Sequence, residues 1–527
     1  MKSLVLVLLS IKCIAGVARD NPVVSTPKGQ IRGLPAQDGD YDMFLGIPYA
    51  DVDEDDPFGA ATEHPAFNET FDAYHDGVQC IQENRNIVTG TIHCLQLNVY
   101  VPHSASPSNT LPVIVYIHGG AFIRGHKGLA NLSPRFLIRH DVIIVSINYR
   151  LGPYGFICVS EPGFNNQALK DQLIALKWVK ENIAAFGGEV SNLTLMGQSA
   201  GAMSIDVLML VKERLADRVI LHSGTALTTW MITTQNDTLP IKMAESLGFE
   251  GEGIKSAMEF LSKTNPTEVI KVAAEYNKVH PATRPCVETA GKDAILTDFP
   301  VNLKPNVRGM DIMIGHANKE VMFLYPNSDK EFYKNYDFGL ELIGDFNAPY
   351  NKDIVRHFYI GDKEPNITLK DVILDYASDF VVVHPTEQTI NRYFSSDVNS
   401  VYRFVFSYEG GRNRNKVRLN LTAEGASHGD DLGYVFDMAL FKGQEVSEED
   451  QVVIDVMTKM WTDFAKYGNP SPSSSSPLQW LPIDRDNRYF LNISKPFSLG
   501  SRPFYDRMAF WDLYYKLNGN NVRGYRP

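Results

Sequence analysis

The stretch that most constrains the fold is an apolar strand, a tight turn and an apolar helix over residues 192–211. The turn reads Gly-Gln-Ser-Ala-Gly and places Ser199 between Gly197 and Gly201. A serine on so sharp a turn needs glycine on either side, because a side chain there would block the turn. The amide of Ala200 then points to where an oxyanion would form, with the positive end of the helix dipole behind it. The pattern is typical of a nucleophile elbow.

The surrounding pattern predicts an α/β fold. Nearly continuous apolar runs at 112–117 and 142–147 indicate strands buried on both faces, and apolar residues at helical spacing predict a helix over 166–186. Strands and helices in alternation predict a central, mostly parallel sheet with helices on both faces. Further elements are expected at 23–33 (a hairpin), 43–47, 95–101, 218–222, 311–315 and 402–407 (strands), and 240–247, 266–274, 447–468 and 510–515 (helices).

Composition limits the partners. The chain has 527 residues, of which 44% are hydrophobic, so a large core is possible. Lys and Arg number 50 against 62 Asp and Glu, a net charge of −12, which argues against nucleic acid or an anionic membrane as a partner. No repeat or linker divides the chain, so we expect one domain over residues 19–527.

The N-terminus predicts export. Residues 1–18 have the charged, apolar and small-residue order of a signal peptide, and the apolar run is too short for a membrane anchor. We therefore expect a secreted protein. Glycosylation sequons that fit this location are found at Asn68, Asn236, Asn366, Asn420 and Asn492.

The cysteines allow one disulfide. Cys80 and Cys94 flank a polar loop, and a bond between them would contribute about 3 kcal/mol to stability. Cys158 and Cys286 are interpreted as small core residues and not as a pair.

Three other segments have the chemistry that a nucleophilic serine needs. Small residues follow His118 after a predicted strand, where uncovered amides could bind an oxyanion. His428 is the histidine best placed as the base, because it lies in a flexible loop after the strand at 402–407. Glu320 follows another predicted strand and gives the order serine, acid, histidine. On position alone, other carboxylates would serve equally well.

The motifs in combination resemble the type-B carboxylesterase/lipase family of the α/β-hydrolase fold. The resemblance runs from about Pro22 to the last helix and rests on residues 148–156, 171–172, 184–188 and 197–201 and the loops around Glu320 and His428. It implies a catalytic triad of Ser199, Glu320 and His428, and an oxyanion hole formed by the amides of Gly120, Ala121 and Ala200. It also implies the disulfide Cys80–Cys94 and a structural ion pair between Arg150 and Asp171.

Gln198 and the loop around His428 are similar to those of insect carboxylesterases, including juvenile hormone esterase-like and antennal esterases. The resemblance implies hydrolysis of small to medium apolar esters, such as xenobiotic, odorant, pheromone or hormone esters, without a metal or cofactor. Three alternatives stay open: a juvenile hormone esterase specifically, a lipase acting at lipid interfaces, and an inactive adhesion or binding protein on the same fold. The sequence does not define the oligomeric state.

Overall fold

The computed structural model describes residues 21–277, 281–325, 329–346, 351–473, 478–484 and 486–524. Its main feature is an 11-stranded sheet. In spatial order the strands are β18 (Ser498–Ser501), β17 (Tyr489–Ile493), β16 (Ser400–Phe406), β15 (Asp311–Ala317), β14 (Arg218–His222), β13 (Gly188–Gln198), β11 (Leu111–Ile117), β12 (Ile143–Ile147), β10 (Gln96–Pro102), β4 (Tyr41–Pro48) and β3 (Leu34–Pro35).

Smaller sheets and the helices complete the secondary structure. The short strands are β1 (Val23–Thr26), β2 (Gly29–Arg32), β5 (Ala50–Asp51), β6 (Thr62–Glu63), β7 (Phe71–Asp72), β8 (Gln82–Asn84) and β9 (Ile87–Thr89). The helices are α1 (Leu129–Leu132), α2 (Arg135–Ile138), α3 (Gly152–Phe156), α4 (Gln167–Asn182), α5 (Ala200–Leu208), α6 (Thr238–Ser246), α7 (Ile254–Lys263), α8 (Pro266–Tyr276), α9 (Lys330–Lys334), α10 (Gly339–Leu342), α11 (Lys352–Ile360), α12 (Lys370–Ser378), α13 (His384–Phe394), α14 (Arg414–Leu419), α15 (Leu432–Val435), α16 (Glu448–Tyr467) and α17 (Tyr505–Asn518).

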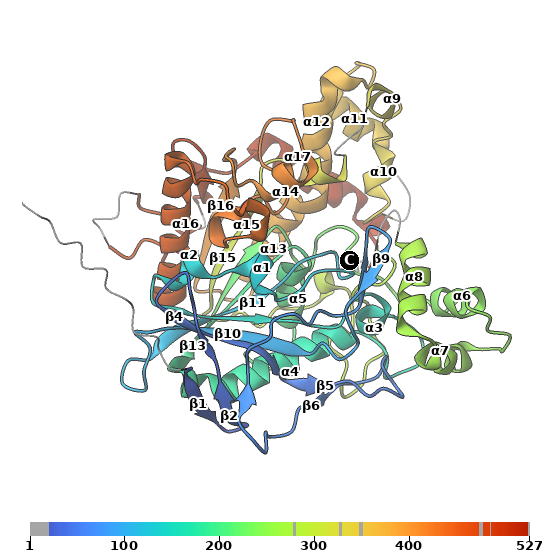
Figure 1. Ribbon diagram of the computed structural model, residues 1–527. Coiled ribbons are helices and arrows are strands. Elements are labelled where there is room, and N and C mark those ends of the chain that lie inside the picture. The colour runs from blue at the N-terminus through green and yellow to red at the C-terminus, as the bar shows by residue number, and fades with distance from the viewer. Residues whose placement is uncertain are drawn as a thin grey trace, which may run out of the picture.

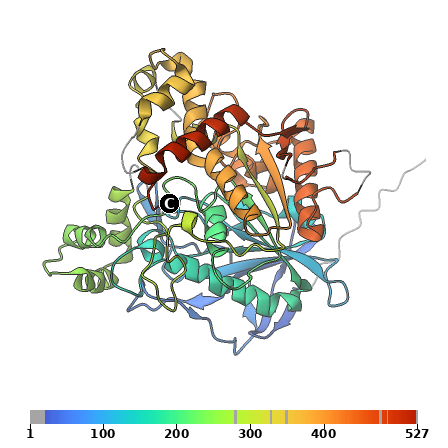
Figure 2. The same cartoon turned by 180° about the vertical axis from the view of Figure 1, so that it is seen from behind.

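The sheet lies between layers of helices (Figure 1). Helices α6, α7 and α8 extend on one side of the molecule, and α9 to α12 form a lobe at the top of the view. From behind, the dark red C-terminal helix α17 passes beside this lobe (Figure 2). Aromatic and aliphatic side chains of the lobe and of α17, among them Tyr376, Phe380 and Trp511, share one buried cluster.

The middle of the sheet is parallel and its two ends are antiparallel. Strands β12, β11, β13, β14, β15, β16 and β17 pair in parallel, whereas β10 pairs antiparallel with both β12 and β4. The predicted strands at 112–117, 142–147 and 218–222 are confirmed, and their residues are almost fully buried, as continuous apolar runs require. Parallel strands bring their carboxyl ends to one edge of the sheet, which is where the site must assemble.

Two predicted helices illustrate how the sequence ends a helix. The helix expected over 166–186 is α4 followed by a 3₁₀ turn, Ile183–Phe186, and it ends at Gly187 with φ 80°. In α16 the hydroxyl of Ser447 accepts a hydrogen bond from the amide of Asp450 at 3.1 Å, and Gly468 ends the helix with φ 71°. The serine binds a backbone amide that has no partner within the helix, and the two glycines adopt a positive φ without strain.

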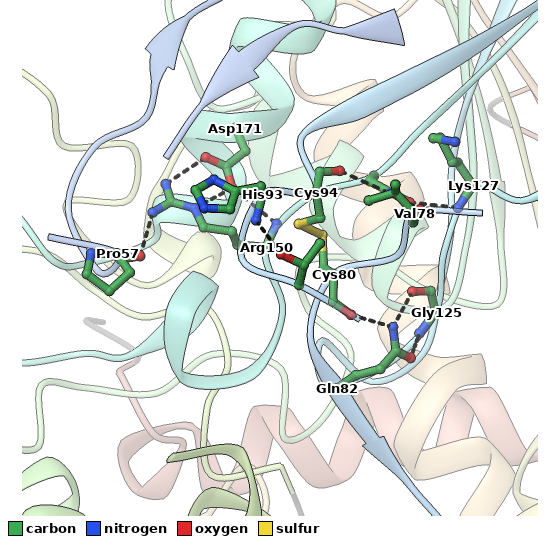
Figure 3. Close-up of a disulfide and its surroundings, with 12 residues drawn as sticks. Pro57, Val78, Cys80, Gln82, His93, Cys94, Gly125, Lys127, Arg150 and Asp171 are labelled. Carbon is green, nitrogen blue, oxygen red and sulfur yellow. Dashed lines mark hydrogen bonds and ion pairs between the residues drawn. A yellow bond between two sulfur atoms is a disulfide. The ribbon is translucent and has the colours of Figure 1, made fainter. Parts of the chain in front are cut away.

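The expectation that Cys158 and Cys286 are unpaired core residues is wrong. They form a disulfide with Cα atoms 6.3 Å apart, although 128 residues separate them. The segment after α8 returns to this position because Asn166 accepts a hydrogen bond from the amide of Cys286 at 2.9 Å and donates one to its carbonyl at 2.8 Å. Such a long-range contact leaves no local signal in the sequence. The disulfide Cys80–Cys94 is confirmed (Figure 3).

Arg150 and Asp171 form the predicted ion pair in the core. The Nε and Nη2 atoms of Arg150 lie 2.9 and 2.7 Å from the two carboxylate oxygens of Asp171. The Nη1 atom donates to the carbonyl of Pro57 (Figure 3) and to that of Gly59. Both side chains are almost fully buried, and their partners lie in structural segments, so the pair fastens the N-terminal chain to α4.

The sequons differ in accessibility. Asn68, Asn236 and Asn420 are exposed and Asn366 is partly exposed. Asn492 lies within β17, where its side-chain oxygen is buried, so that sequon is poorly placed for modification in the folded protein. Residues 1–18, the predicted signal peptide, lie outside the described residues. In the part of the chain that the structure describes, no helix combines the length and the apolar character needed to cross a membrane.

Candidate active site

Ser199 lies on the turn between β13 and α5, with φ 56° and ψ −128°. This strained conformation is held because neighbouring backbone fills the space around the turn. A Cβ atom at Gly197 would lie 2.6 Å from the carbonyl carbon of Gly201, and one at Gly201 would lie 2.0 Å from the carbonyl oxygen of Ile117. The amide of Ser199 donates to the carbonyl of His222 at 2.8 Å. The serine is partly exposed, and its turn has the geometry of a nucleophile elbow.

Glu320 and His428 meet at the same edge of the sheet. Glu320 begins the 3₁₀ turn Glu320–Leu324 after β15, and its Oε2 atom accepts a hydrogen bond from Nδ1 of His428 at 2.6 Å. Its Oε1 atom accepts from the hydroxyl of Ser223 and the amide of Ala317, both at 2.6 Å. The two predicted residues are therefore brought together, with the histidine oriented by the acid.

The environment of Glu320 keeps its carboxylate ionised. Burial by itself raises the pKa of this group, but the electrostatic interaction and hydrogen bond with His428 and the hydroxyl of Ser223 outweigh it and lower the pKa below the usual range. Ser223 was not predicted. It directly follows β14, so the rule that parallel strands meet at their carboxyl ends could have found it.

The second ring nitrogen of His428 faces Gln198. The Nε2 atoms of the two residues are 3.0 Å apart, and because Nδ1 donates to Glu320, Nε2 of His428 is the acceptor. Among the described residues the hydroxyl of Ser199 has no hydrogen-bond partner. The bond between serine and histidine is therefore not formed in this structure, and the amide of Gln198 takes its place. The ring of Phe323 stacks on His428 with centroids 5.0 Å apart.

The loop after β11 lies against the elbow. A Cβ atom at Gly119 would be 2.5 Å from the carbonyl of Gln198 and 3.0 Å from Cβ of Ser199. Gly120 and Ala121 have φ 130° and 55°. Within the described residues, the amides of Gly120, Ala121 and Ala200 donate no hydrogen bond. These are the amides expected to form the oxyanion hole, and they are free to receive an anionic oxygen.

His222 forms a second buried pair that the sequence analysis did not predict. Its Nδ1 atom lies 2.5 Å from a carboxylate oxygen of Asp431, and its Nε2 atom accepts from the indole of Trp461 at 2.8 Å. The side chain is fully buried and thus cannot contact substrate. Since His222 also accepts from the amide of Ser199, the pair connects the elbow to the loop that carries His428.

Replacing Ser223 with alanine tests the support of the acid. We expect kcat/KM to fall about 10-fold, because a hydrogen bond to a charged group is lost. Ser223 stabilises the ionised carboxylate, so its loss raises the pKa of Glu320 and moves the acidic limb of the kcat/KM profile to higher pH. Ser378→Ala is the control, because Ser378 bonds only the amide of Val321 at this turn. Equal shifts of the pH profile in both variants would contradict the assignment.

Together, the sheet and the strained serine turn define an α/β-hydrolase. Residues 20–511 match the carboxylesterase family, and the chain belongs to this family. It is an ester hydrolase.

Relatives support this membership over nearly the whole chain. Human bile salt-activated lipase is 29% identical over 558 residues, covering 98% of this chain and 72% of the lipase. Esterase E4 of Myzus persicae is 30% identical over 491 residues, covering 86% of each chain. The crystal structure of juvenile hormone esterase from Manduca sexta, with OTFP covalently attached, superposes with a TM-score of 0.83 at 26% identity, covering 94% of this chain and all of that one (100%).

Proposed function

We propose that Ser199, Glu320 and His428 form the catalytic triad of a secreted carboxylesterase. The observation that carries the proposal is the contact of His428 with the buried carboxylate of Glu320 beside a serine held in an elbow. The Gly120, Ala121 and Ala200 amides are proposed to stabilise the oxyanion. The mature protein would be a single domain that spans residues 19–527 after removal of the signal peptide. The two disulfides fit secretion, because disulfides persist in oxidising locations.

The reaction begins with an exchange of partners at Nε2 of His428. The amide of Gln198 leaves this nitrogen, and the hydroxyl of Ser199 donates to it instead. His428 then takes the serine proton while the oxygen forms a bond to the ester carbonyl carbon, and Glu320 stabilises the imidazolium. His428 passes the proton to the departing alcohol. Water next gives a proton to His428 and attacks the carbonyl carbon of the acyl-enzyme. As the acid leaves, His428 returns this proton to the oxygen of Ser199, which restores the hydroxyl.

The substrate is proposed to be a small or medium ester with an apolar body. Two observations bear on a more specific substrate: the similarity to juvenile hormone esterase and the similarity to bile salt-activated lipase. A soluble esterase acts on dissolved esters, whereas a lipase is activated when its substrate forms an emulsion. The rate measured across the solubility limit of one ester separates these two candidates.

The experiment combines turnover with labelling. We expect the protein to hydrolyse 4-nitrophenyl esters from acetate to octanoate and to be labelled by a fluorophosphonate at Ser199, as shown by mass spectrometry of the modified peptide. Inhibition should track labelling at one site per chain. Absence of both turnover and label would overturn the proposal and favour a binding protein on the same fold.

A further inference from the structure

Two arginines, Arg124 and Arg414, lie next to segments that hold the proposed catalytic residues. Two more, Arg85 and Arg418, interact with them electrostatically and complete a cluster of four. The four come from three segments, the β8–β9 hairpin, the loop after β11, and α14. On α14 the two arginines are four residues apart and so share one helix face. Within the described residues none of the four pairs with a carboxylate. In a chain with net charge −12, such a group of unpaired cations does not follow from composition.

Arg124 belongs to the loop that presents the oxyanion amides. Its amide donates to the carbonyl of Gly120 at 3.1 Å, and a Cβ atom at Gly120 would lie 1.9 Å from the carbonyl oxygen of Arg124. The next residue, Gly125, makes two hydrogen bonds with the side chain of Gln82 (Figure 3). The amide of Gly125 donates to Oε1 at 2.8 Å, and its carbonyl accepts from Nε2 at 3.0 Å. These bonds fasten the hairpin that carries Arg85 to the loop that carries Arg124.

Helix α14 is fastened to the loop of the base. The side chain of Asn415 donates to the backbone carbonyl of His428 at 2.5 Å, and the backbone amide of Asn415 donates to the carboxylate of Asp430 at 2.6 Å. A Cβ atom at Gly429 would lie 3.7 Å from Nη1 of Arg414. The guanidinium of Arg414 is therefore next to the residue that follows His428, and Arg418 is one turn further along the helix.

The four charges act on one another. Burial and the charges of Arg414, Arg124 and Arg85 lower the pKa of Arg418 to about 10. Burial also lowers the pKa of Arg414, and the charge of Arg124 adds to this effect. Like charges that act on one another in this way are unfavourable, and an anion bound among them would relieve the repulsion.

Two acidic residues lie near Arg414, and each already binds other groups. Asp430 and Asp431 act on its charge. However, Asp430 accepts hydrogen bonds from the amides of Asn415, Lys416 and Ser427, and Asp431 contacts His222. The cluster therefore retains positive charge toward the solvent, where Arg85, Arg124 and Arg418 are exposed.

We propose that this arginine cluster binds an anionic group on the ester substrate, so that the preferred substrates are esters that also carry a carboxylate or another oxyanion. The guanidinium fork matches the geometry of such groups and presents several donors. A local cationic patch on an acidic protein also attracts anionic substrates selectively to the site. The inference rests on the proposed function, because it assigns the substrate of the same site.

The test compares two esters with the same six-carbon acyl chain, mono-4-nitrophenyl adipate and 4-nitrophenyl hexanoate. We expect the ratio of kcat/KM for the anionic over the neutral ester to fall about 10-fold in the double variant Arg124→Gln/Arg418→Gln. In the wild type the ratio should fall as NaCl rises from about 20 to about 500 mM, because salt screens the attraction. Turnover of the neutral ester by the same sample is the internal reference.

The control removes two arginines elsewhere on the surface. Arg139 and Arg308 are ion-paired with Asp455 and Asp397, and the variant Arg139→Gln/Arg308→Gln changes net charge equally. Its ratio should match the wild type. An equal fall in both double variants, or none in Arg124→Gln/Arg418→Gln, would overturn the inference.

A binding measurement separates this inference from the proposed function. In the Ser199→Ala background, calorimetry should show that monoethyl adipate binds more tightly than diethyl adipate, and that Arg124→Gln/Arg418→Gln removes the difference. If the wild type hydrolyses neither ester but this difference holds, the proposed function fails and the anion site stands. If monoethyl adipate binds no more tightly, or if the variant loses only binding to anionic lipid vesicles, the inference fails.

Discussion

Replacing Ser199 with alanine is expected to lower kcat/KM for 4-nitrophenyl butyrate by about 10⁴ to 10⁶-fold. Alanine adopts the φ of 56° no less readily than serine, and it fits the space between Gly197 and Gly201, so the fold should persist. What is lost is the oxygen proposed to form the acyl-enzyme. The free amides of the oxyanion loop remain, so a small residual rate above that of water is expected.

The matched control is Ser191→Ala, because Ser191 lies at an exposed position on β13, the strand that leads into the elbow. It should keep wild-type turnover. Retention of more than about a hundredth of the activity in Ser199→Ala would show that another residue is the nucleophile. Loss of activity in both variants would indicate damage to the strand.

Arg150→Met is expected to lower the free energy of unfolding by about 3–5 kcal/mol, because it leaves Asp171 buried without its partner. The same change frees the carbonyls of Pro57 and Gly59, which now accept from Arg150. Urea unfolding followed by fluorescence measures the effect. The double variant Arg150→Met/Asp171→Leu should recover part of the loss, since the uncompensated charge is gone.

A surface pair provides the comparison. Arg32 and Asp72 lie 2.9 Å apart with side chains 40% and 49% exposed, so Arg32→Met should cost less than about 1 kcal/mol. Equal losses in the two single variants would mean that burial does not determine the cost of breaking an ion pair here.

Local pattern determined how much of the fold could be predicted. The elbow around Ser199 and the strands at 112–117 and 218–222 carry strong local signals, because apolar runs and glycine spacing need only neighbouring residues. The order of strands along the sheet follows from packing across the molecule. Helices α12 and α13 were not predicted. They flank a π-helical turn, Asp379–Val383, whose run of valines lacks helical spacing.

The residues of the site also fall into those that local sequence or family resemblance predicted and those that depend on the folded chain. Glu320 and His428 were predicted, the choice of acid resting on the family resemblance, and the structure joins them. Ser223 and His222 were missed because their roles arise only when β14 lies beside β13 and β15. The arginine cluster was also missed, since its members come from segments that contact one another only in the folded chain.

The contact between Gln198 and His428 spans 230 residues, and that between Glu320 and His428 spans 108. During synthesis the elbow leaves the ribosome long before the loop that carries the proposed base, His428. Contacts of such long range also close slowly during folding. A nascent or truncated chain would therefore hold Ser199 without His428 beside it. On the proposed roles of these residues, we expect hydrolysis of esters to begin only after translation has passed His428 and the late strands have joined the sheet.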